Sequence, residues 1–206
     1  MNKLMLAAVT TLFVSMTVMA YSEEVETDLQ KNIVRLHIIA NSDSVTDQNV
    51  KLKVRDEILK KEGELLSAKN RKDSVNNVRN NLSEFEKTAN ETLAANGFEY
   101  TAHAEYGKFS FPRKEYENIT LPAGEYYGVR LVLGEGKGRN WWCMIYPPLC
   151  TLNGAAALDG KGDEILRESL NGQTYDIITD KSGGVEVKFK IVETVNEIKH
   201  KLNNIK

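Results

Sequence analysis

Two cysteines and three histidines are the residues of this chain whose types suit nucleophilic chemistry. Cys143 with His37 or His103 could form the thiolate and imidazole pair of a cysteine hydrolase, with Asn41 or Asp43 to orient the imidazole. The segment around Cys143, however, predicts a strand, where a side chain is packed rather than presented at a helix N-terminus. We therefore assign no catalytic residue, and a secreted cysteine-dependent peptidoglycan or peptide hydrolase is kept as the alternative function.

The two cysteines, Cys143 and Cys150, are close in sequence and follow a secretory segment. An oxidising exterior favours a disulfide between them. The alternative is a pair of reduced thiols that pack as small apolar residues. A ring this short would contribute only about 2 to 3 kcal/mol by the chain-entropy account. The bridge would thus fix the intervening turn, with Pro147 and Pro148, rather than hold the domain together.

Two loops share features with ligand sites but lack a required part. The acidic loop from Asn41 to Asp47 has oxygen atoms for Ca²⁺, yet it lacks the glycine and the terminal glutamate of a calcium loop. Capping of the next helix by Thr46 or Asp47 is the simpler interpretation. The glycine-rich run 134–138 is followed by no helix that could present its amides to a phosphate. The sequence predicts turns at both places, with no metal and no cofactor.

The end of the glycine-rich run combines charge with large aromatic side chains. Trp141 and Trp142 occupy successive strand positions, so they point to opposite faces and cannot both enter a one-sided core. One of them is expected to be exposed as a partner anchor, because tryptophan and arginine are enriched in binding hot spots. The alternative is a strand covered on both faces. The predicted partner-binding residues are Lys137, Arg139, Asn140, Trp141 and Trp142.

The N-terminus carries the marks of export. Lys3 precedes an apolar run from Leu4 to Ala20, with small residues at Val18 and Ala20 and acidic residues soon after. This pattern predicts a signal peptide over residues 1–20, cut after Ala20. The alternative is an uncleaved anchor, since the run is just long enough to cross a bilayer.

Composition limits what the rest of the chain can be. Its 206 residues, 41% of them hydrophobic, fit one globular domain over residues 21–206. Lys and Arg number 27 against 29 Asp and Glu, so there is no basic field of the kind that binds nucleic acid. A nucleic-acid partner is therefore not expected.

Periodicity places the elements that must hold these residues. Residues 32–40 predict a buried strand, and the next helix has Val50, Val54 and Ile58 on one face. A long helix is predicted over 73–95, then strands over 98–111, 127–133 and 141–146, the last two as a hairpin. Helix 163–170, strand 185–191 and helix 193–203 complete the prediction. The order favours an α+β fold, a two-layer domain whose largely antiparallel sheet has helices packed on one face.

Two segments resemble the stage II sporulation protein R family. The first comprises Val34 to Ser44 with Asp47-Gln48, Lys51-Leu52 and Val54-Arg55-Asp56. The second comprises Leu121 to Tyr126 with Arg130, Gly134 to Cys143, and Pro147 to Cys150. Both are long, and together they cover about residues 33–150 in the right order. Gly128 departs from the resemblance, because a somewhat larger residue is expected there.

The resemblance implies a signalling protein rather than an enzyme. It implies synthesis in the forespore of a Gram-positive bacterium and export into the space between the forespore and mother-cell membranes. There the protein would activate a membrane-embedded aspartic protease of the mother cell, which cleaves the inactive precursor of a sigma factor. No catalytic residue and no small-molecule substrate is implied.

Overall fold

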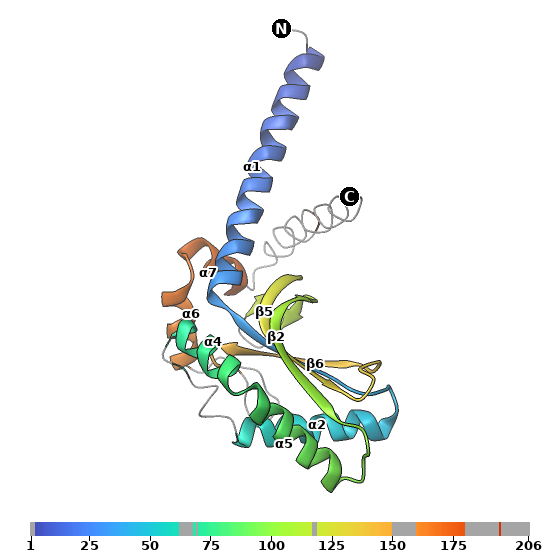
Figure 1. Ribbon diagram of the computed structural model, residues 1–206. Helices are drawn as coiled ribbons and strands as arrows, with labels where there is room; N and C mark the ends of the chain where they lie inside the picture. The colour runs from blue at the N-terminus through green and yellow to red at the C-terminus, as the bar shows by residue number, and fades with distance from the viewer. Residues whose placement is uncertain are drawn as a thin grey trace.

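The computed structural model describes residues 3–61, 68, 70–116, 119–149, 160–179 and 194. The described elements are, in chain order (Figure 1), α1 (Lys3–Asn32), β1 (Val34–Ile39), α2 (Val45–Lys61), α4 (Arg71–Asn80), α5 (Leu82–Ala95), β2 (Ala102–Phe111), β3 (Lys114–Glu115), β4 (Thr120–Leu121), β5 (Gly124–Leu133), β6 (Asn140–Tyr146), α6 (Gly160–Ser169) and α7 (Gly172–Thr179). The strand predicted over 185–191 and the helix predicted over 193–203, apart from residue 194, lie outside the described residues.

The main sheet is mixed and has the strand order β2-β5-β1-β6. β1 runs parallel to β5 and antiparallel to β6, and β2 runs antiparallel to β5. The α+β class with helices packed against the sheet is confirmed. The predicted hairpin of β5 and β6 is wrong, because β1 lies between them. β1 is buried on both faces along nearly its whole length, which suits a central position in the sheet.

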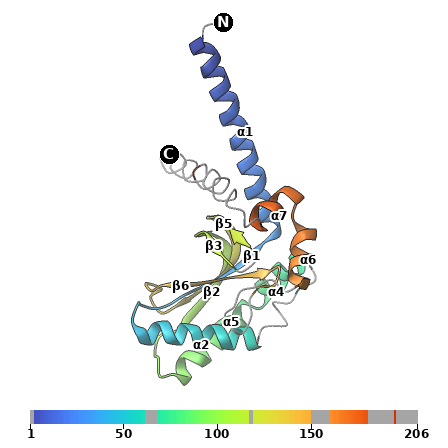
Figure 2. The ribbon, with the colours of Figure 1, turned by 180° about the vertical axis from the view of Figure 1, so that it is seen from behind.

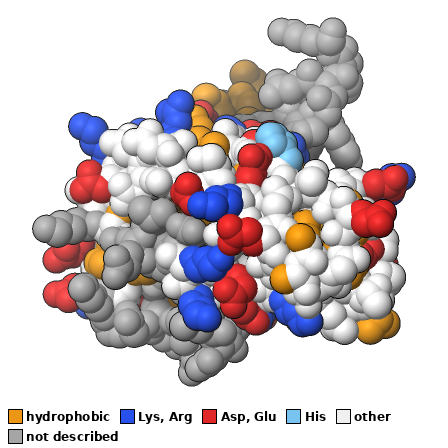
Figure 3. Space-filling view, turned by 60° about the horizontal axis from the view of Figure 1, so that its bottom comes forward, with side chains coloured by type: hydrophobic (Ala, Val, Ile, Leu, Met, Phe, Trp, Pro, Cys, Tyr) orange, Lys and Arg blue, Asp and Glu red, His pale blue; other side chains and the backbone are white. Residues whose placement is uncertain are grey.

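The larger core lies between the sheet and the layer formed by α2 and α5. Leu36 and Ile38 of β1 meet Val54 of α2 and Phe85 of α5, all of them at 0% exposure. Burying each such side chain stabilises the fold by about 1.5 to 3 kcal/mol. Figure 3 brings this layer forward and shows acidic and basic side chains interspersed over its outer surface. The predicted helix over 73–95 is divided at Asn81 into α4 and α5.

A second, smaller core lies on the opposite face of the sheet. It joins the end of α1, the β3–β4 hairpin, α6 and α7, through residues such as Leu29, Leu121, Leu166 and Ile177. Figure 2 shows these elements gathered where α1 meets the body of the protein. The predicted fold had helices on one face only, whereas cover on both faces was the alternative considered for the strand of Trp141 and Trp142.

α1 has two parts with different surroundings. Met5, Leu12 and Phe13 are 60%, 63% and 68% exposed, whereas Val25 and Leu29 are buried in the second core. Among the described residues, Met5–Asn32 is a helix long enough to cross a membrane, and an 18-residue stretch of it has a mean hydropathy of 1.6. The apolar part is consistent with a signal sequence or an anchor, and cleavage after Ala20 stays a prediction.

Candidate functional site

The loop between β1 and α2 is organised around a buried carboxylate. Asp47 accepts hydrogen bonds from Asn41 Nδ2 at 2.9 Å, Ser42 Oγ at 2.6 Å and the Tyr100 hydroxyl at 2.6 Å. Burial alone would raise the pKa of Asp47, but these donors outweigh it, so its pKa lies below the ordinary value. The helix cap is Ser44, whose Oγ accepts from Asp47 N at 3.1 Å. The prediction of Thr46 or Asp47 as the cap is wrong by two or three residues.

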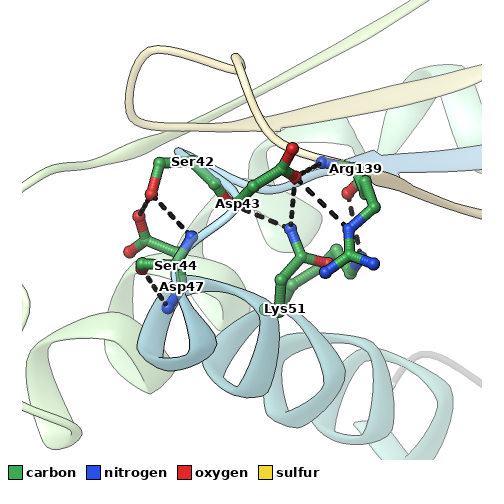
Figure 4. Close-up of polar contacts among 7 residues, drawn as sticks. Ser42, Asp43, Ser44, Asp47, Lys51 and Arg139 are labelled. Atoms are coloured by element: carbon green, nitrogen blue, oxygen red, sulfur yellow. Dashed lines mark hydrogen bonds and ion pairs between the residues drawn. The ribbon is translucent and has the colours of Figure 1, made fainter.

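The loop between β5 and β6 lies directly against this first loop. Gly138 N donates to Ala40 O at 2.9 Å, and Lys137 N donates to Asn41 O at 3.0 Å. Arg139 N donates to Asp43 Oδ1 at 2.7 Å. We call the two loops, residues 40–47 and 134–139, the loop junction (Figure 4). It unites segments almost a hundred positions apart in the chain.

Glycines allow the two loops to approach. Gly134 and Gly136 have φ angles of 56° and 62°, in the left-handed region that favours glycine. A Cβ on Gly138 would overlap the carbonyl oxygen of Ser42. The interpretation of this run as turn residues is confirmed.

Lys51 of α2 is a buried side chain that contacts the loop junction. The residue is 5% exposed, and its Nζ donates to Gln48 Oε1 at 2.7 Å and to Arg139 O at 2.9 Å. Burial lowers the pKa of Lys51, and the charge of Arg139 adds to this effect. Gln48 in turn donates to Ser42 O at 2.9 Å. Lys51 thus bonds the second loop directly and the first loop through Gln48, and Figure 4 shows Lys51 beside Arg139.

The predicted partner-binding residues fall into two groups. The side chains of Lys137 and Arg139 are 75% and 73% exposed, and Asn140 is also exposed. Lys137 pairs with Glu135 at 2.8 Å. Trp141 and Trp142 are both partly buried and pack against opposite cores. The expectation of one exposed tryptophan is therefore wrong, and the alternative of a strand covered on both faces describes the structure.

Each tryptophan has a polar neighbour. The ring of Trp141 lies 5.4 Å from the guanidinium carbon of Arg55. The ring of Trp142 is stacked on His37, with centroids 3.9 Å apart and an interplanar angle of 23°. Both neighbours, Arg55 and His37, belong to the first of the two segments that resemble the stage II sporulation protein R family.

The structure separates the components of the candidate cysteine hydrolase. Cys143 is buried in the core beneath α2 and α5, whereas His37 stacks on Trp142 on the other face of the sheet. His103 lies on β2, at the far edge of the sheet from β6, and pairs with Glu86 at 2.6 Å. These residues do not form a catalytic group. Cys150 lies outside the described residues, so the disulfide stays a prediction.

Sequence reasoning missed Arg35 as a site residue. Arg35 is 0% exposed, and its guanidinium carbon lies 4.3 Å from the ring centroid of Phe111 and 4.9 Å from that of Tyr126. The available signal was a charged residue in an otherwise apolar central strand.

Gly128, the departure noted in the sequence, has a structural reason. It lies opposite Arg35 in the parallel ladder of β1 and β5. A Cβ at this position would overlap the carbonyl oxygen of Arg35. The glycine therefore permits close approach of the two strands.

No group of three or more His, Cys, Asp and Glu side chains in the described part of the chain is placed to hold a metal ion. The family model described as stage II sporulation protein R matches residues 30–156, which include both loops of the junction. The stage II sporulation protein R of Bacillus subtilis (strain 168) is 32% identical over 180 residues, or 80% of each chain. No solved structure matches the chain significantly. The chain belongs to the stage II sporulation protein R family.

Proposed function

We propose that this chain is an exported signalling protein that activates a membrane-embedded aspartic protease. In this account the forespore secretes it into the space between the two sporangium membranes. The activated protease of the mother cell then cleaves a sigma factor precursor. The protein itself acts by binding and catalyses no reaction.

The loop junction is the observation that carries the proposal. Two segments distant in sequence, both within the matched region, meet through hydrogen bonds between their backbones and side chains. The junction presents the exposed side chains of Lys137 and Arg139 from a hydrogen-bonded base. A rigid base limits the conformational entropy lost on association, and a polar rim of this kind suits a protein partner.

Activation requires more than affinity. A ligand shifts a two-state protease only if it binds the active state more tightly than the inactive state. We infer that Lys137, Arg139 and Asn140 contact the protease directly, while Trp141 and Trp142 hold the strand that presents them. Loss of a directly contacting side chain should then reduce activation without unfolding the domain.

The N-terminal helix supports export. If residues 1–20 are a signal peptide, mass spectrometry of the secreted protein should give a chain that begins at Tyr21. A membrane-bound form that begins at Met1 would show an anchor instead. Outside the cell, Cys143 and Cys150 would form the proposed bridge, and thiol labelling of the unfolded, non-reduced protein should then modify neither.

Reconstitution in a non-sporulating host tests the function. The chain is co-expressed, with its N-terminal segment, alongside the candidate protease and the sigma factor precursor. Precursor processing should require both the chain and the protease. The Cys143→Ser variant, provided that it remains folded, should support normal processing. Processing by the chain without the protease, or peptidoglycan cleavage that Cys143→Ser abolishes, would contradict the proposal.

A further inference from the structure

β1 directs two polar side chains into the sheet face opposite α2 and α5. Arg35 is 0% exposed and His37 is 6% exposed. They are two positions apart on one strand, so they share a face. Both contact Phe111, with the Arg35 guanidinium carbon 4.3 Å and the His37 ring centroid 5.8 Å from its centroid. We call these residues, with Tyr116 and Trp142, the Arg35 cluster.

Most of the buried nitrogen atoms of Arg35 and His37 lack a hydrogen-bond partner in the described part of the chain. Nε and Nη1 of Arg35 and both ring nitrogens of His37 have no hydrogen-bond partner within the described residues. Nη2 of Arg35 donates to the Tyr116 hydroxyl at 3.4 Å, which is long for such a bond. Tyr116 is therefore the one hydrogen-bond acceptor of this guanidinium in the described part of the chain, and it carries no charge.

A buried guanidinium in this state is energetically costly. Arginine stays charged in proteins, so it cannot escape the cost of burial by losing its proton. Cation–π contacts with the rings of Phe111 and Tyr126 offset part of the hydration energy that the guanidinium loses on burial. A carboxylate would offset more of this lost energy, because its two oxygens can accept two hydrogen bonds from the planar guanidinium. One guanidinium also balances the single charge of a carboxylate, whereas a phosphate dianion would exceed it.

The cover over Arg35 is a small separate sheet. β3 and β4 pair with each other and not with the main sheet, and Tyr116 N donates to Ile119 O at 2.8 Å in the turn between them. Tyr116 contacts the guanidinium of Arg35 through its hydroxyl and is itself only partly buried. Displacement of Tyr116 would open a route to the guanidinium without disturbing the pairing of β1.

We propose that Arg35, with His37 beside it, receives a carboxylate side chain of the partner protein, which enters by displacing Tyr116. The identity of the partner rests on the proposed function. The carboxylate chemistry rests on the Arg35 cluster alone. Binding would replace the weak contact to Tyr116 by charged hydrogen bonds and would hold the β3–β4 hairpin in a displaced position.

Formate tests the chemistry without any protease. Trp141→Phe leaves Trp142, stacked on His37, as the sole tryptophan of the chain. Chloride is exchanged for formate at constant ionic strength, and fluorescence and Tm are recorded. We expect a saturable change in fluorescence and a rise in Tm, both absent when Arg35→Met is added. Equal responses to chloride and formate, or a response that survives Arg35→Met, would overturn the proposal.

Arg35→Met tests the role of the cluster in signalling. Methionine has similar length and no charge, so it should raise the Tm by about 3 °C or more, because it removes an unpaired buried ion. The same variant should reduce precursor processing at least tenfold. Arg79→Met is the matched control, because Arg79 is exposed and lies 5.6 Å from the ring of Tyr106. It should change neither quantity measurably.

The outcomes separate the two proposals. A lower Tm for Arg35→Met would show that arginine stabilises the fold through its ring contacts, and full processing with a raised Tm would show that signalling needs no carboxylate receptor. Either result overturns the inference and leaves the proposed function intact. If the wild-type chain fails to drive processing, the proposed function fails, while the formate titration still decides the chemistry of Arg35.

Discussion

The loop junction and the Arg35 cluster each contain a buried ionic side chain, but they treat it differently. Asp47 accepts hydrogen bonds from three side chains at 2.6 to 2.9 Å. Arg35 has one acceptor at 3.4 Å and two aromatic faces. Burial of an ion costs several kcal/mol, and a desolvated cation–π contact returns about 2 kcal/mol. The charge of Asp47 is thus compensated by hydrogen bonds within the fold, whereas that of Arg35 is compensated only in part.

Asp47→Ala should give the largest loss of stability. The change removes an acceptor shared by Asn41, Ser42 and Tyr100, and it should lower the free energy of unfolding by about 3 kcal/mol or more. Urea denaturation measures the loss. Asp56→Ala on the same helix is the control, because the Asp56 side chain is 46% exposed and its pair with Arg55 should contribute about 1 kcal/mol or less. Equal losses in the two variants would remove the distinction we draw for Asp47.

Acid should weaken the two regions over different pH ranges. Burial lowers the pKa of His37 to about 4. The Asn140 side chain opposes this shift in part, and the charges of Arg130 and Arg35 add smaller effects that favour the neutral form. Titration of His37 therefore leaves the free energy of unfolding unchanged above the ordinary histidine pKa of 6.5. It lowers this free energy by up to about 3 kcal/mol as the pH drops towards 4. The pKa of Asp47 is also lowered, so its contribution is lost only below its ordinary value of 3.8.

His37→Leu separates these ranges. Unfolding by urea at a series of pH values should lose its pH dependence between 6.5 and 4 in this variant, while the loss at lower pH remains. An unchanged profile between 6.5 and 4 would show that His37 is not the group that titrates there.

Gly138→Ala should have a smaller effect on the loop junction. The new Cβ would overlap Ser42 O, and the loops must separate slightly, at a cost of about 1 to 3 kcal/mol. Gly172→Ala is the control, because nothing lies within 4 Å of its added Cβ and it stands in a helix, where alanine is favoured by up to about 1 kcal/mol. Thermal melts that rank the two variants in the opposite order would contradict the close contact between the loops.

Much of the fold follows from local patterns in the sequence. Local patterns predicted the strand at 32–40, the helices of the α2 and α5 layer, and the glycine turns. Each of these depends on periodicity or on backbone freedom. The position of β1 between β5 and β6 could not be predicted, because strand order depends on contacts between distant segments. The same reason explains the false hairpin, since adjacent strands with a short loop usually pair.

The candidate site was only partly predictable. Lys137 and Arg139 were identified from their charge beside a glycine-rich turn, and both side chains are exposed, while their role in binding stays a prediction. The partial burial of both Trp141 and Trp142 depends on the second core, which lies on the face of the sheet opposite α2 and α5. Arg35 was missed because a sequence does not show whether a charged side chain in a strand finds a partner.

Surface variants at the loop junction test the recognition account most directly. Lys137→Ala with Arg139→Ala removes two exposed charges but keeps the backbone bonds of Arg139 to Asp43 and Lys51. Lys60→Ala with Lys87→Ala removes the same charge from side chains that are 70% and 62% exposed on the α2 and α5 layer. Both double variants should melt like the wild type. In the reconstituted host we predict at least a tenfold loss of precursor processing for the first pair and none for the second. Full processing by the first pair, or equal losses in both, would contradict recognition through the loop junction.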